Sequence, residues 1–273
     1  MESAETDPIP LTPPAASTAI APTWHTLVLV VVIAGFSIHG AWLLSSSHRE
    51  LNRLATYGMA AGMDVLMLAW IAFGLRLRKI SFHSLLGSCP ISFRSILRDL
   101  SYAAVFWVVA LMVLGSLGSA WLRTEEMLTQ QTPAARGAEN ARQALASESA
   151  KLEALRALKR LAPVSASEIA AWTLLCLLVG FTEEVVFRGY LQRQFTCWAR
   201  GSVVWGVAAS ALVFGSGHIY EGARGMFLIA VFGALFSLLA LYRRSLRAGM
   251  MAHAWHDLIT GLTVTVLSAK HIL

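Results

Sequence analysis

Seven apolar runs of about bilayer length constrain this 273-residue chain more than any other feature of its sequence. A transmembrane helix needs roughly 17 to 25 mostly apolar residues. The runs cover 24–44, 57–75, 102–122, 169–187, 202–220, 225–241 and 248–267, and the fourth continues as a helix to about residue 197. We therefore expect an all-α fold, a polytopic transmembrane bundle of about seven to eight helices.

The composition supports a membrane protein and excludes several other classes. Hydrophobic residues make up 56% of the chain and charged residues 14%, whereas soluble domains carry about 25% charged residues. A small soluble protein cannot bury that much apolar surface, so an ordinary soluble enzyme is excluded, as are a collagen and a disordered chain. The three cysteines show no CxxC spacing, so neither a disulfide framework nor a zinc knuckle is expected.

The chain divides into a short tail and one membrane domain. Residues 1–23 contain five prolines and no lysine or arginine, so we expect a disordered tail. The single membrane domain, 24–273, comprises N-terminal spans at 24–122, an amphipathic helical loop at 123–165 and a core with chemical motifs at 166–273. Within the loop, leucines recur at helical spacing from 137 to 162, which predicts one long amphipathic extramembrane helix that packs on the bundle.

The basic residues predict the orientation of the chain. The net charge is +6, but lysine and arginine lie between the apolar runs, where they set topology, so no nucleic acid is expected as a partner. With the N-terminus inside, the short inner loops hold ten basic residues and the short outer loops three. We expect a multi-pass protein of the lipid bilayer, in the inner (plasma) membrane of a bacterium, with a cytoplasmic N-terminus.

Ionisable residues inside the apolar runs are the next informative feature, because each costs about 2.5 to 3.5 kcal/mol in a membrane. The run at 181–190 contains Glu183, Glu184 and Arg188. Glu184 and Arg188 are four residues apart and share a helix face, so we expect them to pair. Glu183 lies about 100° around the helix and stays free to act as a general base. The alternative is a purely structural ion pair that fixes helix register.

Two later segments carry histidines in similar surroundings. Phe214-Gly215-Ser216-Gly217-His218 places a histidine after small residues, which allow a helix break or a close helix approach. His253 and Asp257 share a helix face, so the carboxylate can accept a hydrogen bond from the imidazole N–H and orient the ring. With straight spans, however, His218 and His253 fall at different depths. A break at Gly215–Gly217 or a shift of the span boundaries would bring them together.

Three other polar residues have simpler expectations. His256 lies to the other side of His253 from Asp257 and is expected at a helix interface. Asp64 and His39 lie in the first two spans, where we expect hydrogen bonds between helices rather than catalysis.

The order Glu183-Glu184-x-x-x-Arg188, Phe214-x-x-x-His218, His253-x-x-x-Asp257 resembles the motif set of the CPBP intramembrane proteases. This family, also called Abi, includes CAAX prenyl endopeptidases and bacteriocin-processing or self-immunity proteins. The resemblance covers about the last 110 residues, and residues 1–160 show no matching motif. The family often has asparagine at the last position, where this chain has Asp257.

The resemblance implies peptide-bond hydrolysis within the membrane, in which Glu183 activates a water with the help of His218. Arg188 holds Glu184, and His253 with Asp257 stabilises the oxyanion. Spacing does not decide which glutamate is the base. In a second version, Glu183, His218 and His253 hold one Zn²⁺ whose bound water attacks. No cofactor is therefore certain, and zinc is the candidate.

The expected substrate is a peptide or protein, either prenylated or embedded in the membrane, and its identity does not follow from the sequence. Two other functions use the same polar residues. A non-catalytic chaperone or self-immunity factor would bind a peptide in the pocket, and an ion-coupled carrier would move charge through it. The absence of a convincing internal repeat argues against the carrier.

Overall fold

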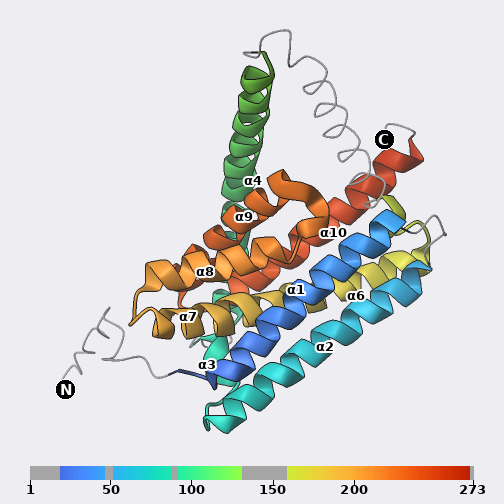
Figure 1. Cartoon of the computed structure of the whole chain (residues 1–273). Helices are drawn as coiled ribbons and strands as arrows, with labels where there is room; N and C mark the ends of the chain where they lie inside the picture. Colours follow the sequence, from blue (N-terminus) through green and yellow to red (C-terminus); the bar gives the residue numbers. More distant parts are fainter. Residues whose placement is uncertain (1–18, 47–51, 88–91, 131–158, 271–273) are drawn as a thin grey trace, which may run out of the picture.

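The computed structural model describes residues 19–46, 52–87, 92–130 and 159–270, and their regular elements are helices (Figure 1). The elements are α1 (Thr23–Ser46), α2 (Arg53–Leu77), α3 (His83–Leu86), α4 (Phe93–Gln130), α6 (Ala166–Glu183), the π-helix η2 (Glu184–Leu191), α7 (Gln192–Trp198), α8 (Val203–Ser216), the short 3₁₀ helix η3 (Ile219–Glu221), α9 (Gly222–Arg243) and α10 (Arg247–Ala269). This architecture confirms the all-α polytopic bundle.

Each predicted span corresponds to a helix, but the helices differ in their fitness to cross a membrane. Five in the described ranges are long and apolar enough by length and composition: Thr23–Trp42, Arg53–Leu77, Phe93–Met127, Ala166–Trp198 and Ile219–Arg243. α8 is apolar but has 14 residues, and α10 carries the polar motif with His253 and Asp257. The tail at 1–18 and most of the expected amphipathic helix, 131–158, lie outside the described residues.

The short length of α8 bears on the depth mismatch expected for His218. Its 14 residues rise about 21 Å, whereas the hydrocarbon core is about 30 Å thick. The helix ends at Ser216, Gly217 caps it, and the chain turns through η3 into α9. His218 therefore lies at the end of a helix that stops short of a full span, as a break at the small residues would produce.

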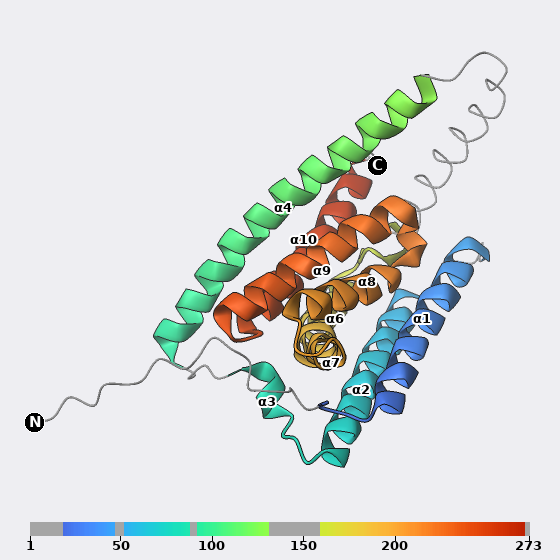
Figure 2. The same cartoon turned by 60° about the vertical axis from the view of Figure 1, so that its left-hand side comes forward.

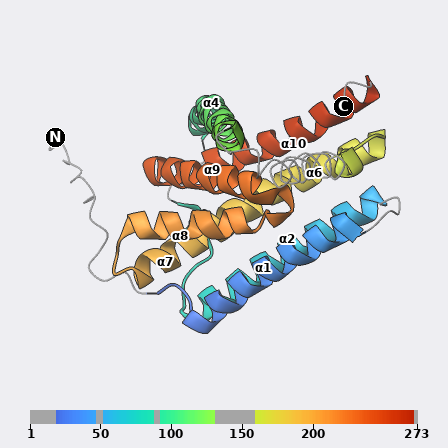
Figure 3. The ribbon, with the colours of Figure 1, turned by 45° about the horizontal axis from the view of Figure 1, so that its top comes forward.

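The helices form three groups. Figure 3, in which α4 is seen nearly end-on, places the α1–α2 pair on one side and α4 on the other, with the C-terminal helices between them. Figure 2 shows α4 running past α9 and α10 and beyond the bundle. Its 38 residues extend about 57 Å, which exceeds the thickness of the hydrocarbon core.

The start of α1 is fixed to α2 and η2 by a buried polar network. His25 Nε2–H donates to the Trp70 carbonyl oxygen at 2.8 Å, which leaves Nδ1 to accept from the Tyr190 hydroxyl at 2.8 Å. Thr26 contacts the same hydroxyl at 2.9 Å. Gly74 allows this approach, because a Cβ there would overlap the His25 ring. The end of the bundle that contains the start of α1, the end of α2, and α3 is called the α3 end below.

α4 is held to the C-terminal helices by one charged and one aromatic contact. Asp99 is fully buried and lies 2.6 Å from guanidinium nitrogens of both Arg243 and Arg247. One to two turns further along α4, the Phe106 ring lies 4.7 Å from that of Phe236 on α9. These contacts position α9, whose residues form one wall of the polar site described next.

Candidate active site

The segment that carries the two glutamates begins as a well-capped helix. The Ser165 hydroxyl accepts from the Glu168 backbone N–H at 3.2 Å, and the Glu168 carboxylate accepts from the Ser165 N–H at 3.2 Å. This capping box satisfies two backbone donors at the start of α6. The helix changes at Glu184 into a π-helix of eight residues. Such segments are rare and frequently occur at functional sites, and this one carries Glu184 and Arg188.

Glu184 and Arg188 form the predicted ion pair, with Arg188 Nη1 2.9 Å from Glu184 Oε1. Both side chains are almost fully buried. Arg188 Nη2 also donates to the Gly233 carbonyl oxygen at 3.2 Å. The guanidinium carbon lies 4.4 Å from the centre of the Phe214 ring and 4.9 Å from that of Phe236, so aromatic faces stabilise its charge.

His253 lies between the two glutamates. Its Nδ1–H donates to Glu184 Oε1 at 3.2 Å, and its Nε2 lies 3.3 Å from Glu183 Oε2. Asp257 Oδ2, the partner expected from spacing, is further from Nε2, at 3.9 Å. The residues that orient His253 are therefore on α6 and η2, and helix spacing within α10 could not reveal them. The contact with Glu184 is a hydrogen bond, and the contact with Glu183 is an ion pair when both ring nitrogens carry a proton.

Close packing of α10 on η2 depends on Gly249. A Cβ at this position would lie 2.8 Å from Glu184 Oε2 and 3.2 Å from Glu184 Cδ. The absence of a side chain at Gly249 therefore lets the α10 backbone pass directly over the buried carboxylate, four residues before His253.

The Phe214 ring contacts both His218 and His253. The Phe214 ring centre lies 5.2 Å from that of His218 and 6.0 Å from that of His253. His218 Nδ1–H donates to the Phe214 carbonyl oxygen at 2.9 Å. Since a carbonyl oxygen can only accept, this bond leaves Nε2 as the acceptor of the neutral ring. His218 also lies within electrostatic range of Asp257.

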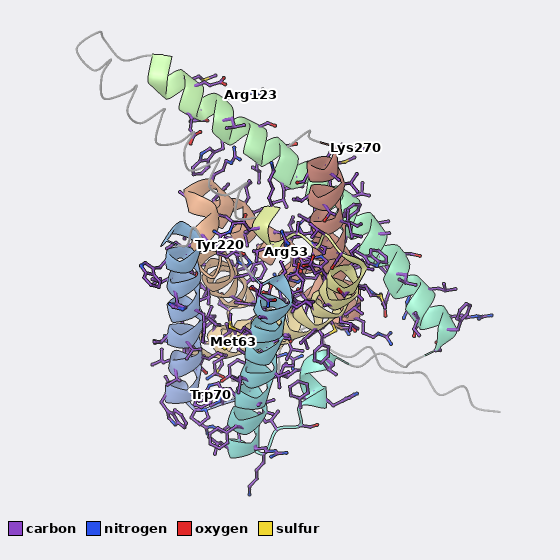
Figure 4. The ribbon with its side chains drawn as sticks, turned by 90° about the vertical axis from the view of Figure 1, so that its right-hand side faces the viewer. Arg53, Met63, Trp70, Arg123, Tyr220 and Lys270 are labelled. Atoms are coloured by element: carbon purple, nitrogen blue, oxygen red, sulfur yellow. The ribbon has the colours of Figure 1, made fainter. Side chains whose placement is uncertain are left out.

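The cluster has a closed side and an open side. The Glu184 side chain is 0% exposed, whereas Glu183 is 21% and Asp257 28% exposed. His218 is also half-buried, and Tyr220 beside it is exposed. Figure 4 labels Tyr220 at the turn after α8. Glu183 is therefore the more accessible carboxylate of the pair, while Glu184 and Arg188 are enclosed.

Asp64 is a residue whose relation to the site the sequence did not predict. It lies on α2, one position after Met63, which Figure 4 labels, and it is buried. Its carboxylate is in electrostatic contact with Glu183, His253 and Asp257. Its Oδ2 has no hydrogen-bond partner among the described residues. Only the packing of α2 on α6 brings it there, so no local motif could have indicated it.

Two further histidines considered in the sequence analysis are not part of the cluster. His256 packs its ring 4.9 Å from that of Phe232 on α9, which agrees with an interface position. His39 stacks on Trp42 within α1, with ring centres 5.9 Å apart.

The donor set does not fit a metal ion as it is arranged. Among the residues that the structure describes, no three His, Cys, Asp or Glu side chains form a metal-binding group. Of the three candidate ligands, His253 has a carboxylate oxygen beside each ring nitrogen, and His218 approaches through Phe214. A zinc ligand set would need both imidazoles to present a free nitrogen to one point.

A comparison with known protein families tests the resemblance to the CPBP proteases that the sequence motifs indicated. Residues 165–259 match the family described as Rce1-like, type II CAAX prenyl endopeptidase Rce1-like. This part of the chain is similar to the Rce1-like family. The match confirms the predicted CPBP and CAAX-protease resemblance, and at family level it supports a membrane endopeptidase. The Rce1-like segment begins at the N-cap of α6 and contains all six predicted site residues. No curated protein and no solved structure matches the chain.

Proposed function

We propose that this protein is an intramembrane endopeptidase in which Glu183 activates a water for attack on a peptide carbonyl. Glu183 has the accessible carboxylate of the pair, whereas Glu184 is enclosed by Arg188, His253 and Gly249. A general base needs access to the proton that it removes, so Glu183 is the base and Glu184 a positioning residue.

The reaction proceeds by proton transfers between water, Glu183 and the peptide. Glu183 takes a proton from water while the oxygen bonds to the carbonyl carbon. His218 holds this water through its acceptor Nε2. The carbon–nitrogen bond then breaks, and the proton on Glu183 passes to the leaving amine, which yields a new carboxylate and a new amine.

The oxyanion of the tetrahedral intermediate is stabilised by His253. Its Nε2–H faces the open side of the cluster between Glu183 and Asp257. Arg188 holds Glu184, and Glu184 in turn holds the ring through Nδ1. Asp257 is an acceptor when ionised, so it balances the charge of His253 rather than donating to the oxyanion. No step uses a metal.

The observation that carries the proposal is the meeting of acids and an imidazole from two distant segments. Residues 183 and 253 are 70 positions apart, yet their side chains lie 3.3 Å from each other in an otherwise apolar bundle. Ionisable groups at such depth are costly unless they have a function or a partner. The Rce1-like match over the same residues adds support for peptide hydrolysis.

The proposal includes the substrate class and the orientation of the chain in the membrane. The substrate is a peptide or protein that is prenylated or embedded in the membrane, because the polar cluster lies among membrane helices. The N-terminus is cytoplasmic, so the α3 end, which carries Arg76, Arg78, Arg193 and Arg244, faces the cytoplasm, as the positive-inside rule expects.

The test is cleavage of a membrane-anchored peptide by the purified full chain in lipid nanodiscs. Glu183→Gln and His218→Ala are each expected to lower kcat at least 100-fold, the scale of general-base catalysis. Glu126→Gln, an exposed position on α4, is the control that keeps activity. Equal cleavage by all four proteins would contradict the proposal. Substrate binding without cleavage by the wild type would favour the chaperone or immunity function.

A further inference from the structure

A cavity of about 520 Å³ lies at the α3 end of the bundle. Three segments line it: α3, the boundary between η2 and α7, and the turn between α9 and α10. Its size is in the range of small-ligand pockets, about 300 to 1,000 Å³. Arg188 also lines it, so this cavity and the glutamate–histidine cluster are neighbours.

The walls of the cavity are fixed by backbone contacts between distant segments. Gly87 pairs with Ser245 as an isolated antiparallel bridge, and the Leu246 N–H donates to the Leu86 carbonyl oxygen at 3.1 Å. Gly87 has a φ of +86°, and a Cβ there would overlap the Arg244 carbonyl oxygen. Arg193 Nη1 donates to the Ser84 carbonyl oxygen at 2.8 Å. These contacts between distant segments therefore fix the shape of the cavity.

The charges around the cavity are unbalanced. The cationic or titratable side chains that line it are His83, Arg188, Arg193 and Arg244, and no aspartate or glutamate is among its lining residues. Arg188 is neutralised by Glu184, whereas the neighbouring Arg243 and Arg247 share the single carboxylate of Asp99. No ion pair joins Arg193 or Arg244 to a carboxylate within the described ranges, and both are exposed. The Arg193 charge is thus not neutralised, although both terminal nitrogens donate to the carbonyl oxygens of Ser84 and Leu85, and the Arg244 guanidinium is available to an anion.

We propose that this cavity binds the phosphate group of an anionic phospholipid. Guanidinium groups match phosphate oxygens with paired hydrogen bonds. The apolar wall formed by Leu85, Leu241 and Leu246 suits the start of an acyl chain. The cavity also lies where several membrane helices end, the depth at which headgroups are found, and basic pockets between such helices are suited to acidic headgroups.

Helix termini provide matched controls for the arginine at the cavity. Lys79, Arg200 and Arg244 each follow the end of a helix with a left-handed backbone, at φ of 56°, 55° and 52°. Of the three, only Arg244 lines the cavity. Substitutions at Lys79 and Arg200 therefore remove the same charge from the same backbone setting without affecting the cavity.

The experiment measures lipid binding to the full chain by native mass spectrometry, with phosphatidylglycerol and phosphatidylcholine as probes. Wild type is expected to bind phosphatidylglycerol at least tenfold more tightly than phosphatidylcholine. Arg244→Gln should lower this preference about threefold and Arg193→Gln/Arg244→Gln about tenfold, whereas Lys79→Gln/Arg200→Gln should keep it. Because Arg193 also supports α3, Arg244→Gln alone decides the outcome if the double variant does not fold.

Two results would overturn the proposal. One is an Arg244→Gln protein that binds phosphatidylglycerol as the control variant does. The other is displacement of the lipid by millimolar inorganic phosphate with equal stabilisation of the fold, which would mean that the cavity binds free phosphate. Since the readout is binding, neither result depends on peptidase activity.

Discussion

His253 Nε2 on α10 and Glu183 Oε2 on α6 lie 3.3 Å apart. The same ring donates through Nδ1 to Glu184 at 3.2 Å, so one imidazole connects both carboxylates of the glutamate doublet. This connection joins the two halves of the Rce1-like segment, and the predictions below test what it contributes to stability and chemistry.

Removal of Arg188 should destabilise the fold strongly. Arg188→Met leaves Glu184 buried without its guanidinium partner, and breaking a buried pair from one side costs about 3 to 5 kcal/mol. The thermal midpoint in detergent should fall accordingly. Glu184→Gln/Arg188→Met removes both charges and should lose less stability than Arg188→Met alone. A double variant that is less stable than the single one would contradict this account of the pair.

Gly249→Ala should disrupt the packing of α10 on Glu184. The new methyl would lie 2.8 Å from Glu184 Oε2, and the carboxylate is held by Arg188 and His253. We expect a loss of about 1 to 3 kcal/mol, as for other overpacked cores, together with reduced cleavage. Gly118→Ala is the matched control, because its Cβ would meet Leu228 at an ordinary 3.6 Å. Equal thermal midpoints for the two variants would show that the space between Gly249 and Glu184 can accept a methyl group.

Asp257→Asn should keep cleavage within about threefold of wild type or raise it. The amide keeps the acceptor oxygen and adds a donor for the oxyanion, and one such donor is worth about 10²- to 10³-fold in kcat. Asp257→Ala should lose both properties and fall at least tenfold below Asp257→Asn. The measurement is kcat of the two variants in the same nanodiscs. Equal kcat values for Asp257→Ala and Asp257→Asn would contradict this role of residue 257.

Chelation should leave cleavage unchanged. The proposed chemistry uses Glu183, His218 and His253 without a metal, since both nitrogens of His253 face carboxylates. Incubation with EDTA or 1,10-phenanthroline, followed by the cleavage assay and elemental analysis, provides the measurement. Loss of activity that added Zn²⁺ restores would establish the metal-bound alternative.

The sequence predicted the helices and the Glu184–Arg188 pair well because both depend on local spacing. Apolar runs define spans without reference to the rest of the chain, and residues four apart on a helix meet. Two features that local spacing could not predict come from tertiary packing. Asp64 approaches the site because α2 packs on α6, and His253 turns toward the glutamates because α10 crosses η2 at Gly249. The shortness of α8 was visible only as a stretch of small residues before His218.

If Glu183 and His253 act as one catalytic unit, a double-mutant cycle on kcat/KM should show strongly non-additive losses. We expect Glu183→Gln/His253→Ala to cleave a membrane-anchored peptide about as slowly as the slower single variant. Losses that multiply, with the double variant slower by the product of the two single effects, would contradict this expectation.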